Sequence, residues 1–237
     1  MAVNLFFIPH QDDEALTFGA AIRNHLDVGD ECRVIIYTDG STSNVRRQLN
    51  GEIKSALYRK TLNPAEEGYK PLQEQDMTAY RNDEFLRSCK ALGVPDKHIH
   101  FSRHLVKDGT TTVESCEKVL QEFLERYPEA RVKVFTDLGG NHRDHANMGT
   151  AGRNLLRSGA IRDLRLYVEP YNLRNAKKAG IPIHKEKSAT HAEKVVDALK
   201  EYTKWNPALQ QFAIGYHSVK KCFDAAMARP ISYYHKP

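Results

Sequence analysis

Histidines and carboxylates gather in two short segments of the chain. Residues 9–14 read Pro-His-Gln-Asp-Asp-Glu, and residues 141–145 read Asn-His-Arg-Asp-His. His10 and Asp13 are three residues apart at a predicted strand-to-helix turn, where their side chains can converge on one point. A third ligand would come from the second segment, from His142 or His145. Two imidazoles and one carboxylate with an open position form the ligand set of a catalytic zinc site.

The other polar side chains of these segments suit acid–base chemistry at such a site. Adjacent side chains point in different directions, so Asp12 and Asp13 are expected to divide the work. One binds the ion and the other faces whatever the ion binds. Asp12 would take the proton from the metal-bound water, and the histidine that is not a ligand would donate to an oxyanion or to a leaving amine.

Each segment also has a purely structural interpretation. A carboxylate cluster at a helix start is usually a cap and a partner of the helix dipole, and a His-x-x-His pair is more often at the surface than on a metal. Spacing alone supports the two interpretations equally. The chain has neither a G-x-G-x-x-G turn after the first predicted strand nor a P-loop. With no competing cofactor motif, the position of both segments at strand ends favours a metal.

The elements that must position these residues alternate along the chain. Apolar runs predict five strands, and helical spacing of apolar residues predicts helices between and after them. The pattern predicts an α/β fold with a mostly parallel sheet and helices on both faces. Ligands of such sheets bind outside the carboxyl ends of the strands, where both segments lie. The predicted strands cover 3–8, 32–38, 98–102, 132–136 and 164–168, and the clearest helices cover about 14–26, 77–92, 113–124 and 192–199.

Composition limits the class of protein. The chain has 237 residues, of which 41% are hydrophobic, and the charges give 35 − 30 = +5. This length fits one large domain. The basic residues are dispersed rather than clustered, which argues against nucleic-acid binding and leaves room for an anionic small substrate. No apolar stretch approaches a membrane span of about 20 residues. Four distant cysteines without a CxxC pair predict reduced thiols in a cytoplasmic protein.

The motifs resemble those of one known family. Residues 9–14 are similar to the [A/P]-H-P-D-D-E motif of the PIG-L/LmbE-like N-acetylglucosaminyl de-N-acetylases, and residues 140–145 to their later H-P-D-H motif. Segments 37–40, 81–84, 91–94 and 108–109 also resemble the family, in register over about 3–170. The resemblance implies a single Rossmann-like domain over 1–237, with a core of 1–170 and a C-terminal helical and loop layer of 171–237.

The resemblance also implies an activity and a role for each site residue. The activity is zinc-dependent hydrolysis of an N-acetyl group, usually on an amino sugar, with Fe²⁺ able to occupy the same ligands. The ligands carried over by position are His10, Asp13 and His145. Asp12 would be the general base, and His142 would stabilise the oxyanion or protonate the amine. Asp144 would hydrogen-bond to an imidazole and fix its orientation.

Substrate contacts are predicted at five further positions, each with an alternative. Arg81 falls where the family has an arginine that is thought to touch substrate, or it pairs with Glu84 on a helix surface. Asp39 and Ser41 would bind sugar hydroxyls or only form a turn. Arg143, which replaces a motif proline as Gln11 does, would meet an acidic substrate or face solvent. His217 would reach the pocket from a lid.

Two weaker features and several rival functions remain. His98, His100 and His104 form a less favoured second metal site, and Trp205 is expected to pack in the C-terminal layer rather than stack on a sugar. The rival functions are hydrolysis of another N-acyl small molecule, a non-catalytic sugar-binding relative and a metal phosphoesterase. The last is disfavoured because two-metal sites use several bridging carboxylates. The expected partner is a small N-acetylated molecule, and a homo-oligomer is possible.

Overall fold

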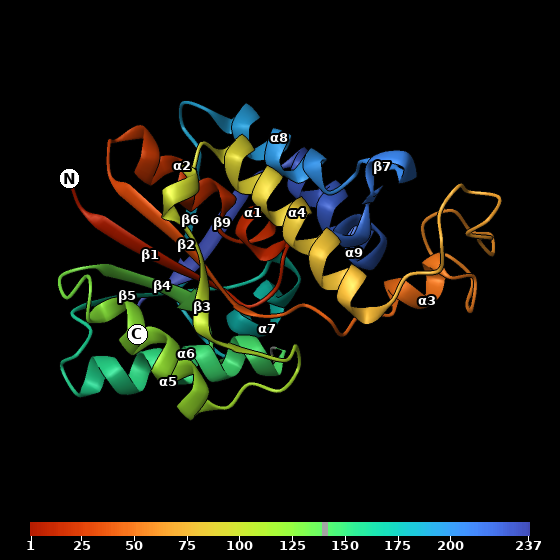
Figure 1. The fold of residues 1–237 in the computed structure, drawn as a ribbon. Helices are drawn as coiled ribbons and strands as arrows, with labels where there is room; N and C mark the ends of the chain where they lie inside the picture. The colour runs from red at the N-terminus through yellow and green to blue at the C-terminus, as the bar shows by residue number, and fades with distance from the viewer. Residues whose placement is uncertain (139–141) are drawn as a thin grey trace.

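A seven-stranded sheet runs through the centre of the computed structural model, which describes residues 1–138 and 142–237 (Figure 1). Its strand order is β3-β2-β1-β4-β5-β9-β6. The first five strands of this order are parallel, whereas β9 is antiparallel to β5 and to β6. The mostly parallel sheet predicted from the sequence is thereby confirmed. The strands are β1 (Val3–Ile8), β2 (Glu31–Thr38), β3 (Ile99–Val106), β4 (Arg131–Phe135), β5 (Asp163–Tyr167), β6 (His184–Lys187) and β9 (Ile231–His235).

Helices cover both faces of the sheet, each over its own hydrophobic core (Figure 1). Alternate residues of β1 enter different cores, Phe6 and Ile8 on one face and Leu5 and Phe7 on the other. This alternation explains why the strand is apolar throughout. One face carries α1 (Asp13–Leu16), α2 (Gly19–Asp27), α4 (Glu74–Leu92), α8 (Ala192–Glu201) and α9 (Ile214–Ala228), and the other carries α5 (Val113–Leu124) and α6 (Arg143–Arg157).

The first predicted helix is divided in two. The sequence predicts one helix over 14–26, but α1 ends at Leu16 and α2 begins at Gly19. The short α1 follows β1 after the turn of residues 9–12, and α2 packs closely on α8. A Cβ atom at Gly19 would lie 2.8 Å from Cγ1 of Val195, which is closer than carbon atoms pack. The small residue is therefore required where α2 meets α8.

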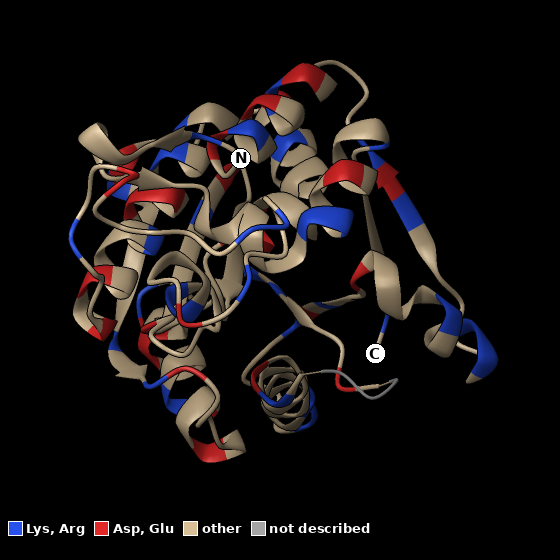
Figure 2. Cartoon of the chain, turned by 90° about the vertical axis from the view of Figure 1, so that its right-hand side faces the viewer, with Lys and Arg blue, Asp and Glu red and all other residues tan. Residues whose placement is uncertain are grey.

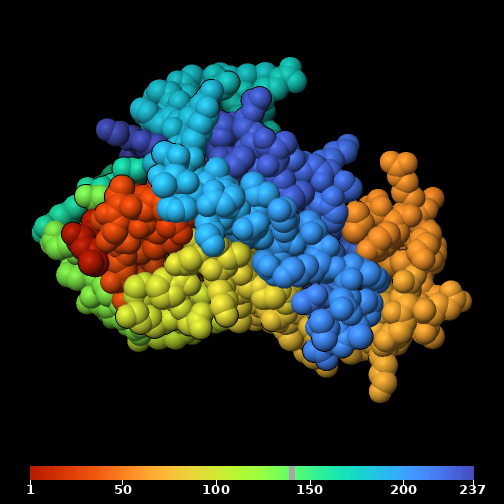
Figure 3. Space-filling view, turned by 90° about the horizontal axis from the view of Figure 1, so that it is seen from above, coloured from red at the N-terminus to blue at the C-terminus, as the bar shows by residue number. Residues whose placement is uncertain are grey.

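A third, smaller hydrophobic cluster lies beside the carboxyl edge of the sheet. It joins α3 (Val45–Leu49) and the following loop to the hairpin of β7 (Trp205–Asn206) and β8 (Gln211–Phe212). Figure 3 shows this loop, in orange, packed beside the C-terminal segment, in blue. Trp205 packs against this cluster, near Tyr58 and Tyr69, as the packing interpretation predicts.

Charged residues of both signs are interspersed along the chain. Figure 2 shows Lys and Arg mixed with Asp and Glu over the elements in view. None of the described helices is both long and apolar enough to cross a membrane. The remaining elements are α7 (Leu173–Lys178) and the 3₁₀ turns η1 (Asp96–His98), η2 (Pro170–Asn172) and η3 (Pro207–Leu209).

Candidate metal centre and active site

The turn between β1 and α1 holds an unusual backbone. Asp12 has φ 145° and ψ −26°, a backbone conformation that residues other than glycine rarely adopt. The backbone N–H of Asp13 donates to the carbonyl of His10 at 3.3 Å, and that of Leu16 donates to the carbonyl of Asp12 at 3.0 Å. Such strained positions occur at functional sites, where the surrounding fold maintains them. Here the turn brings both His10 and Asp13 to the edge of the sheet.

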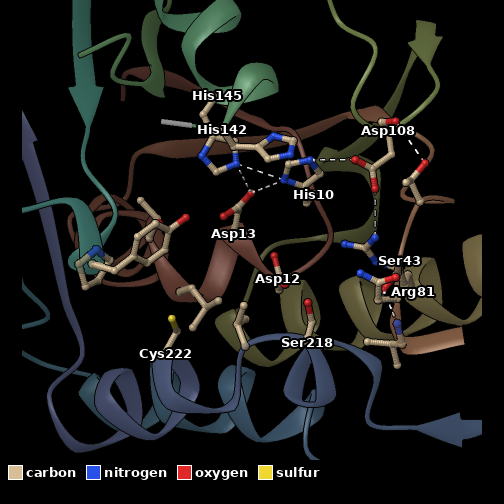
Figure 4. A pocket seen from close by; sticks show the side chains of 18 of the residues that line it. His10, Asp12, Asp13, Ser43, Arg81, Asp108, His142, His145, Ser218 and Cys222 are labelled. Carbon is tan, nitrogen blue, oxygen red and sulfur yellow. Dashed lines mark hydrogen bonds and ion pairs between the residues drawn. The ribbon is translucent and has the colours of Figure 1, made fainter. Parts of the chain in front are cut away.

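Three potential ligand atoms form a triangle at this edge (Figure 4). Nδ1 of His10 lies 3.1 Å from Nε2 of His145, and Oδ2 of Asp13 lies 3.4 Å from the first and 3.3 Å from the second. A tetrahedral ion with bonds of 2.0–2.2 Å separates its ligands by roughly 3.3–3.5 Å. The sides of the triangle therefore fit a single cation. Within the described chain, Asp13 Oδ2 makes no hydrogen bond.

Carboxylates hold the far nitrogen of each imidazole. Nε2 of His10 lies 3.2 Å from Asp108 and 3.2 Å from Asp144, and Nδ1 of His145 is bonded to Glu169. A proton on each far nitrogen would satisfy these carboxylates and leave the near nitrogen free to bind a metal. Asp144 is itself fixed, since it accepts from the Gly109 N–H at 2.8 Å and from Thr111 Oγ1 at 2.7 Å. Asp144 therefore lies against Nε2 of His10, and its orienting role stays a prediction.

Sequence reasoning missed Glu169. It follows the end of β5, as the predicted site segments follow β1 and β4, and it is fully buried. Its position at a strand end was the available signal, but one carboxylate without a motif around it does not stand out. Asp108, which precedes a Gly in the family-like segment 108–109, was likewise not assigned a role. Both carboxylates belong to the shell that surrounds the triangle.

The two adjacent aspartates differ in their electrostatics. Burial and the neighbouring charge of Asp13 together raise the pKa of Asp12 to about 7. Burial acts on Asp13 in the same direction, but His145 and His10 outweigh it and hold its pKa below the ordinary range. Asp13 is therefore the ionised member, as a metal ligand must be. Asp12 has the proton affinity of a base that works near neutral pH.

The carboxylates around the imidazoles attract positive charge. Burial alone lowers the pKa of His10, yet Asp108, Asp13 and Asp144 together raise it well above its ordinary value. The pKa of His145 is likewise raised to about 9: burial lowers it, but Asp13 and Glu169 outweigh that effect. The triangle thus favours a cation, either protons on the rings or a metal ion. The donor set fits a divalent metal.

His142 lies beside the triangle and is about half exposed. Its ring centre is 4.8 Å from that of His10, and its Nδ1 accepts the N–H of Asp144 at 3.3 Å. Burial lowers the pKa of His142, and the neighbouring His10 and His145 lower it further. The ring is therefore neutral near pH 7 and can donate only one N–H. Gly140 and Asn141 of the predicted motif lie outside the described residues.

A cavity of about 530 Å³ opens in front of these side chains, within the 300–1,000 Å³ of typical small-molecule sites. Arg81 reaches it from α4, and its Nη1 donates to the carbonyl of Gly40 at 2.7 Å. Glu84 does not pair with Arg81 but accepts the N–H groups of Ile214 and Gly215 at 2.7 and 3.0 Å. Arg81 thus lines the cavity and forms no ion pair with Glu84, and its contact with substrate stays a prediction.

The other predicted substrate contacts lie outside the cavity lining. Asp39 accepts the N–H groups of Ser41 and Asp108 at 3.0 and 2.9 Å, so it organises the loops behind the site. Arg143 is the exposed first residue of α6. His217 is buried against Tyr58 and Trp205 instead of covering the cavity.

The three histidines of the less favoured second metal site do not converge on one point. His98 lies 4.0 Å from Glu31, and His100 contacts Arg33 at 3.0 Å. His104 contacts Arg103. Besides the triangle, two groups of three residues in the described part of the chain bring potential ligand atoms within 4.8 Å of one another, and both contain His10. They are His10 with His142 and His145, and His10 with Asp108 and Asp144.

Comparison with known proteins places this geometry in context. A family model described as GlcNAc-PI de-N-acetylase, PIG-L, matches residues 5–156. No curated protein sequence matches the chain. The fold is similar to the zinc-inhibited form of teicoplanin deacetylase Orf2, with TM-score 0.65, 14% identity and 100% and 99% of the two chains covered.

Two further solved structures share the fold but differ in activity. One is the N,N′-diacetylchitobiose deacetylase from Pyrococcus horikoshii, with TM-score 0.60, 16% identity and 99% and 82% of the chains covered. The other is the 4-carboxy-2-hydroxymuconate hydratase GalB from Pseudomonas putida, with TM-score 0.59, 14% identity and 100% and 95% covered. At these identities the similarity shows the fold alone, and the reaction must be argued from the site.

Proposed function

Because the chain belongs to the PIG-L family, described as GlcNAc-PI de-N-acetylase, we propose that it is a metal-dependent hydrolase that removes an N-acetyl group from an amino sugar or glycoconjugate. The observation that carries the proposal is the triangle of His10, Asp13 and His145, with Asp12 beside it and not engaged in it. A separate carboxylate with a raised pKa is what a hydrolase needs in addition to a metal site.

The three triangle residues would hold the metal. Zn²⁺ suits two imidazoles and one carboxylate, and Fe²⁺ accepts the same donors. When bound, the ion would polarise the acyl carbonyl and lower the pKa of a coordinated water. Asp108, Asp144 and Glu169 would keep the two imidazoles in the required orientation and tautomer.

The residues around the triangle would carry out the proton transfers. Asp12 accepts a proton from the attacking water while the water oxygen bonds to the acyl carbon. His142 is neutral and donates its N–H to the oxyanion that develops on the carbonyl oxygen. The C–N bond then breaks, its electron pair leaves with nitrogen, and the proton held by Asp12 passes to that nitrogen. The products are a carboxylic acid, which loses its remaining proton to water, and a free amine.

The polar side of the cavity supports an amino-sugar substrate. Thr42, Ser43, Asn44 and Gln48 offer hydroxyl and amide groups, and Arg81 adds a cation. Groups of this kind hydrogen-bond to sugar hydroxyls. The diacetylchitobiose deacetylase, an enzyme named for an acetylated amino sugar, has the same fold.

The test is acetate release by metal-loaded protein. N-acetylglucosamine, diacetylchitobiose and N-acetyl amino acids would be incubated with protein loaded with Zn²⁺ or Fe²⁺, and acetate and free amine would both be quantified. We expect release from the sugars, and a loss of about 10²–10⁴ in kcat for Asp12→Asn with metal content unchanged. Absence of acetate from every compound contradicts the proposal, and so does an Asp12→Asn variant with wild-type turnover.

A further inference from the structure

The cavity has two chemically different ends, with the triangle between them. Its polar end contains Arg81 and Ser43, next to Asp108 (Figure 4). Cys222 lies on the other side of Asp12 and Asp13 (Figure 4). The apolar side chains of the lining are Leu16, Val45, Pro170, Tyr171, Val219 and Cys222, and all except Val45, which belongs to α3, come from α1, η2 and α9.

Electrostatic proximity places these apolar side chains close to the reacting centre. Burial raises the pKa of the Cys222 thiol, and the charges of Asp12 and Asp13 raise it further. The Tyr171 hydroxyl donates to Glu169 at 3.4 Å. Tyr171 and Cys222 therefore stand together on one side of the triangle.

The backbone of α9 is shaped to present this surface. Val219 has φ −137° and ψ 47°, which interrupts the helix between Ile214 and Ala228. Ser218, Val219 and Cys222 all line the cavity around this interruption. Val219 and Cys222 remain partly exposed, and Tyr171 is 59% exposed. Apolar side chains left uncovered inside a ligand cavity indicate an apolar part of the ligand.

The geometry of amide hydrolysis decides which part of the substrate lies against the apolar side chains of the cavity. The acyl carbon must lie at the triangle, with the amine substituent on one side and the acyl substituent on the other. When the sugar occupies the polar end, the acyl substituent extends toward Tyr171 and Cys222. An acetyl methyl group covers little of that surface.

Resting on the function proposed above, we propose that the same site also hydrolyses N-acyl chains longer than acetyl, whose methylene groups lie against Leu16, Tyr171, Val219 and Cys222. Water adds to the acyl carbon, the C–N bond breaks, and the nitrogen keeps the electron pair and takes a proton. The products are a linear alkanoic acid, which loses a proton to water, and the free amino sugar.

A chain-length series tests the proposal. N-acetyl-, N-butanoyl-, N-hexanoyl- and N-octanoylglucosamine would be assayed with the metal-loaded enzyme. Each methylene that becomes buried is expected to raise kcat/KM about fourfold, until the chain fills the apolar end. Hydrolysis of the acetyl compound with no gain for longer chains overturns this inference and leaves the proposed function intact. No hydrolysis of any member overturns both.

Two variants and a pair of glycosides test whether the acyl chain, rather than an apolar group elsewhere on the sugar, occupies the apolar end of the cavity. Val219→Asn makes the apolar end polar and Cys222→Phe fills it, so both should lower the hexanoyl-to-acetyl ratio of kcat/KM toward one. Lys221→Asn, on the exposed side of the same helix, is the matched control and should keep the wild-type ratio. A gain for the hexyl over the methyl glycoside of N-acetylglucosamine, without one for N-hexanoylglucosamine, overturns the acyl assignment.

Discussion

At the residue scale, the site is an arrangement of carboxylates around two imidazoles. His10 and His145 turn one nitrogen each toward Asp13 and toward each other, and present the other nitrogen to buried carboxylates. The types and spacing of the motif residues predicted His10 and Asp13 and left the third member open between His142 and His145, and only the family resemblance implied His145. Neither predicted Glu169, because its role depends on β5 lying next to β4.

Glu169 provides a direct test of this arrangement. Glu169→Gln keeps the size of the side chain but removes the charge that favours a proton on His145 Nδ1. We expect metal affinity to fall by about 10–100-fold, measured by competition with a chelator of known affinity. Glu186→Gln changes a carboxylate that is bonded to Arg165 on β5, and is the control. Equal affinity in the wild-type and Glu169→Gln proteins would refute the positioning role.

The two histidines of the second motif should respond differently to substitution. His142→Ala is expected to lower kcat by about 10²–10³, the typical effect of losing one oxyanion donor, with metal content retained. His145→Ala removes a corner of the triangle and should abolish metal binding as well. Turnover and metal content per chain, measured on the same samples, distinguish them. A metal-free His142→Ala protein would make His142 a ligand and exchange the two roles.

At the scale of elements, the parallel part of the sheet was predictable and its antiparallel edge was not. β1, β2 and β4 are apolar runs, whereas β6 reads His-Lys-Glu-Lys and is mostly exposed. An exposed polar strand has no hydrophobic pattern. The interruption of α9 at Val219 was also unpredictable, because neither glycine nor proline marks it. That segment forms one wall of the cavity, so the shape of the apolar end emerged only from the structure.

Glu84 fastens the start of α9 to α4. Its buried carboxylate accepts the N–H groups of Ile214 and Gly215, which lack helical partners at a helix start. Glu84→Ala leaves both unpaired, and we expect unfolding free energy to fall by about 1–3 kcal/mol, measured by urea denaturation. Glu84→Gln retains an acceptor oxygen and should lose less. An alanine variant as stable as the wild type would show that this contact does not anchor the helix.

At the scale of the whole molecule, stability depends on the protonation of one buried lysine, because its ammonium group is not compensated within the core. Lys133 is fully buried on β4, and within the described chain its Nζ has no hydrogen-bond partner. Burial lowers its pKa from 10.5 to about 7. Between these two pH values the unfolded chain binds the extra proton, so folding stability rises with pH. Below pH 7 both states are protonated, and the full penalty of burying the ammonium group applies.

Replacement of Lys133 by methionine should therefore stabilise the protein. We expect Lys133→Met to add about 1–3 kcal/mol to the unfolding free energy at pH 6.5, and less at pH 9.5, where the folded wild-type lysine is already neutral. Urea denaturation at the two pH values measures the difference. A gain that is equal at both values, or larger at pH 9.5, would contradict the lowered pKa.

The fold as a whole brings residues 10, 13 and 145 to one edge of the sheet, and the account depends on that convergence. The most direct measurement is anomalous X-ray scattering from crystals of the protein soaked in Zn²⁺. We predict one strong peak, about 2.0–2.2 Å from Nδ1 of His10, Nε2 of His145 and a carboxylate oxygen of Asp13. A peak bound elsewhere, or none at these three atoms, would contradict the proposed centre and the hydrolytic mechanism built on it.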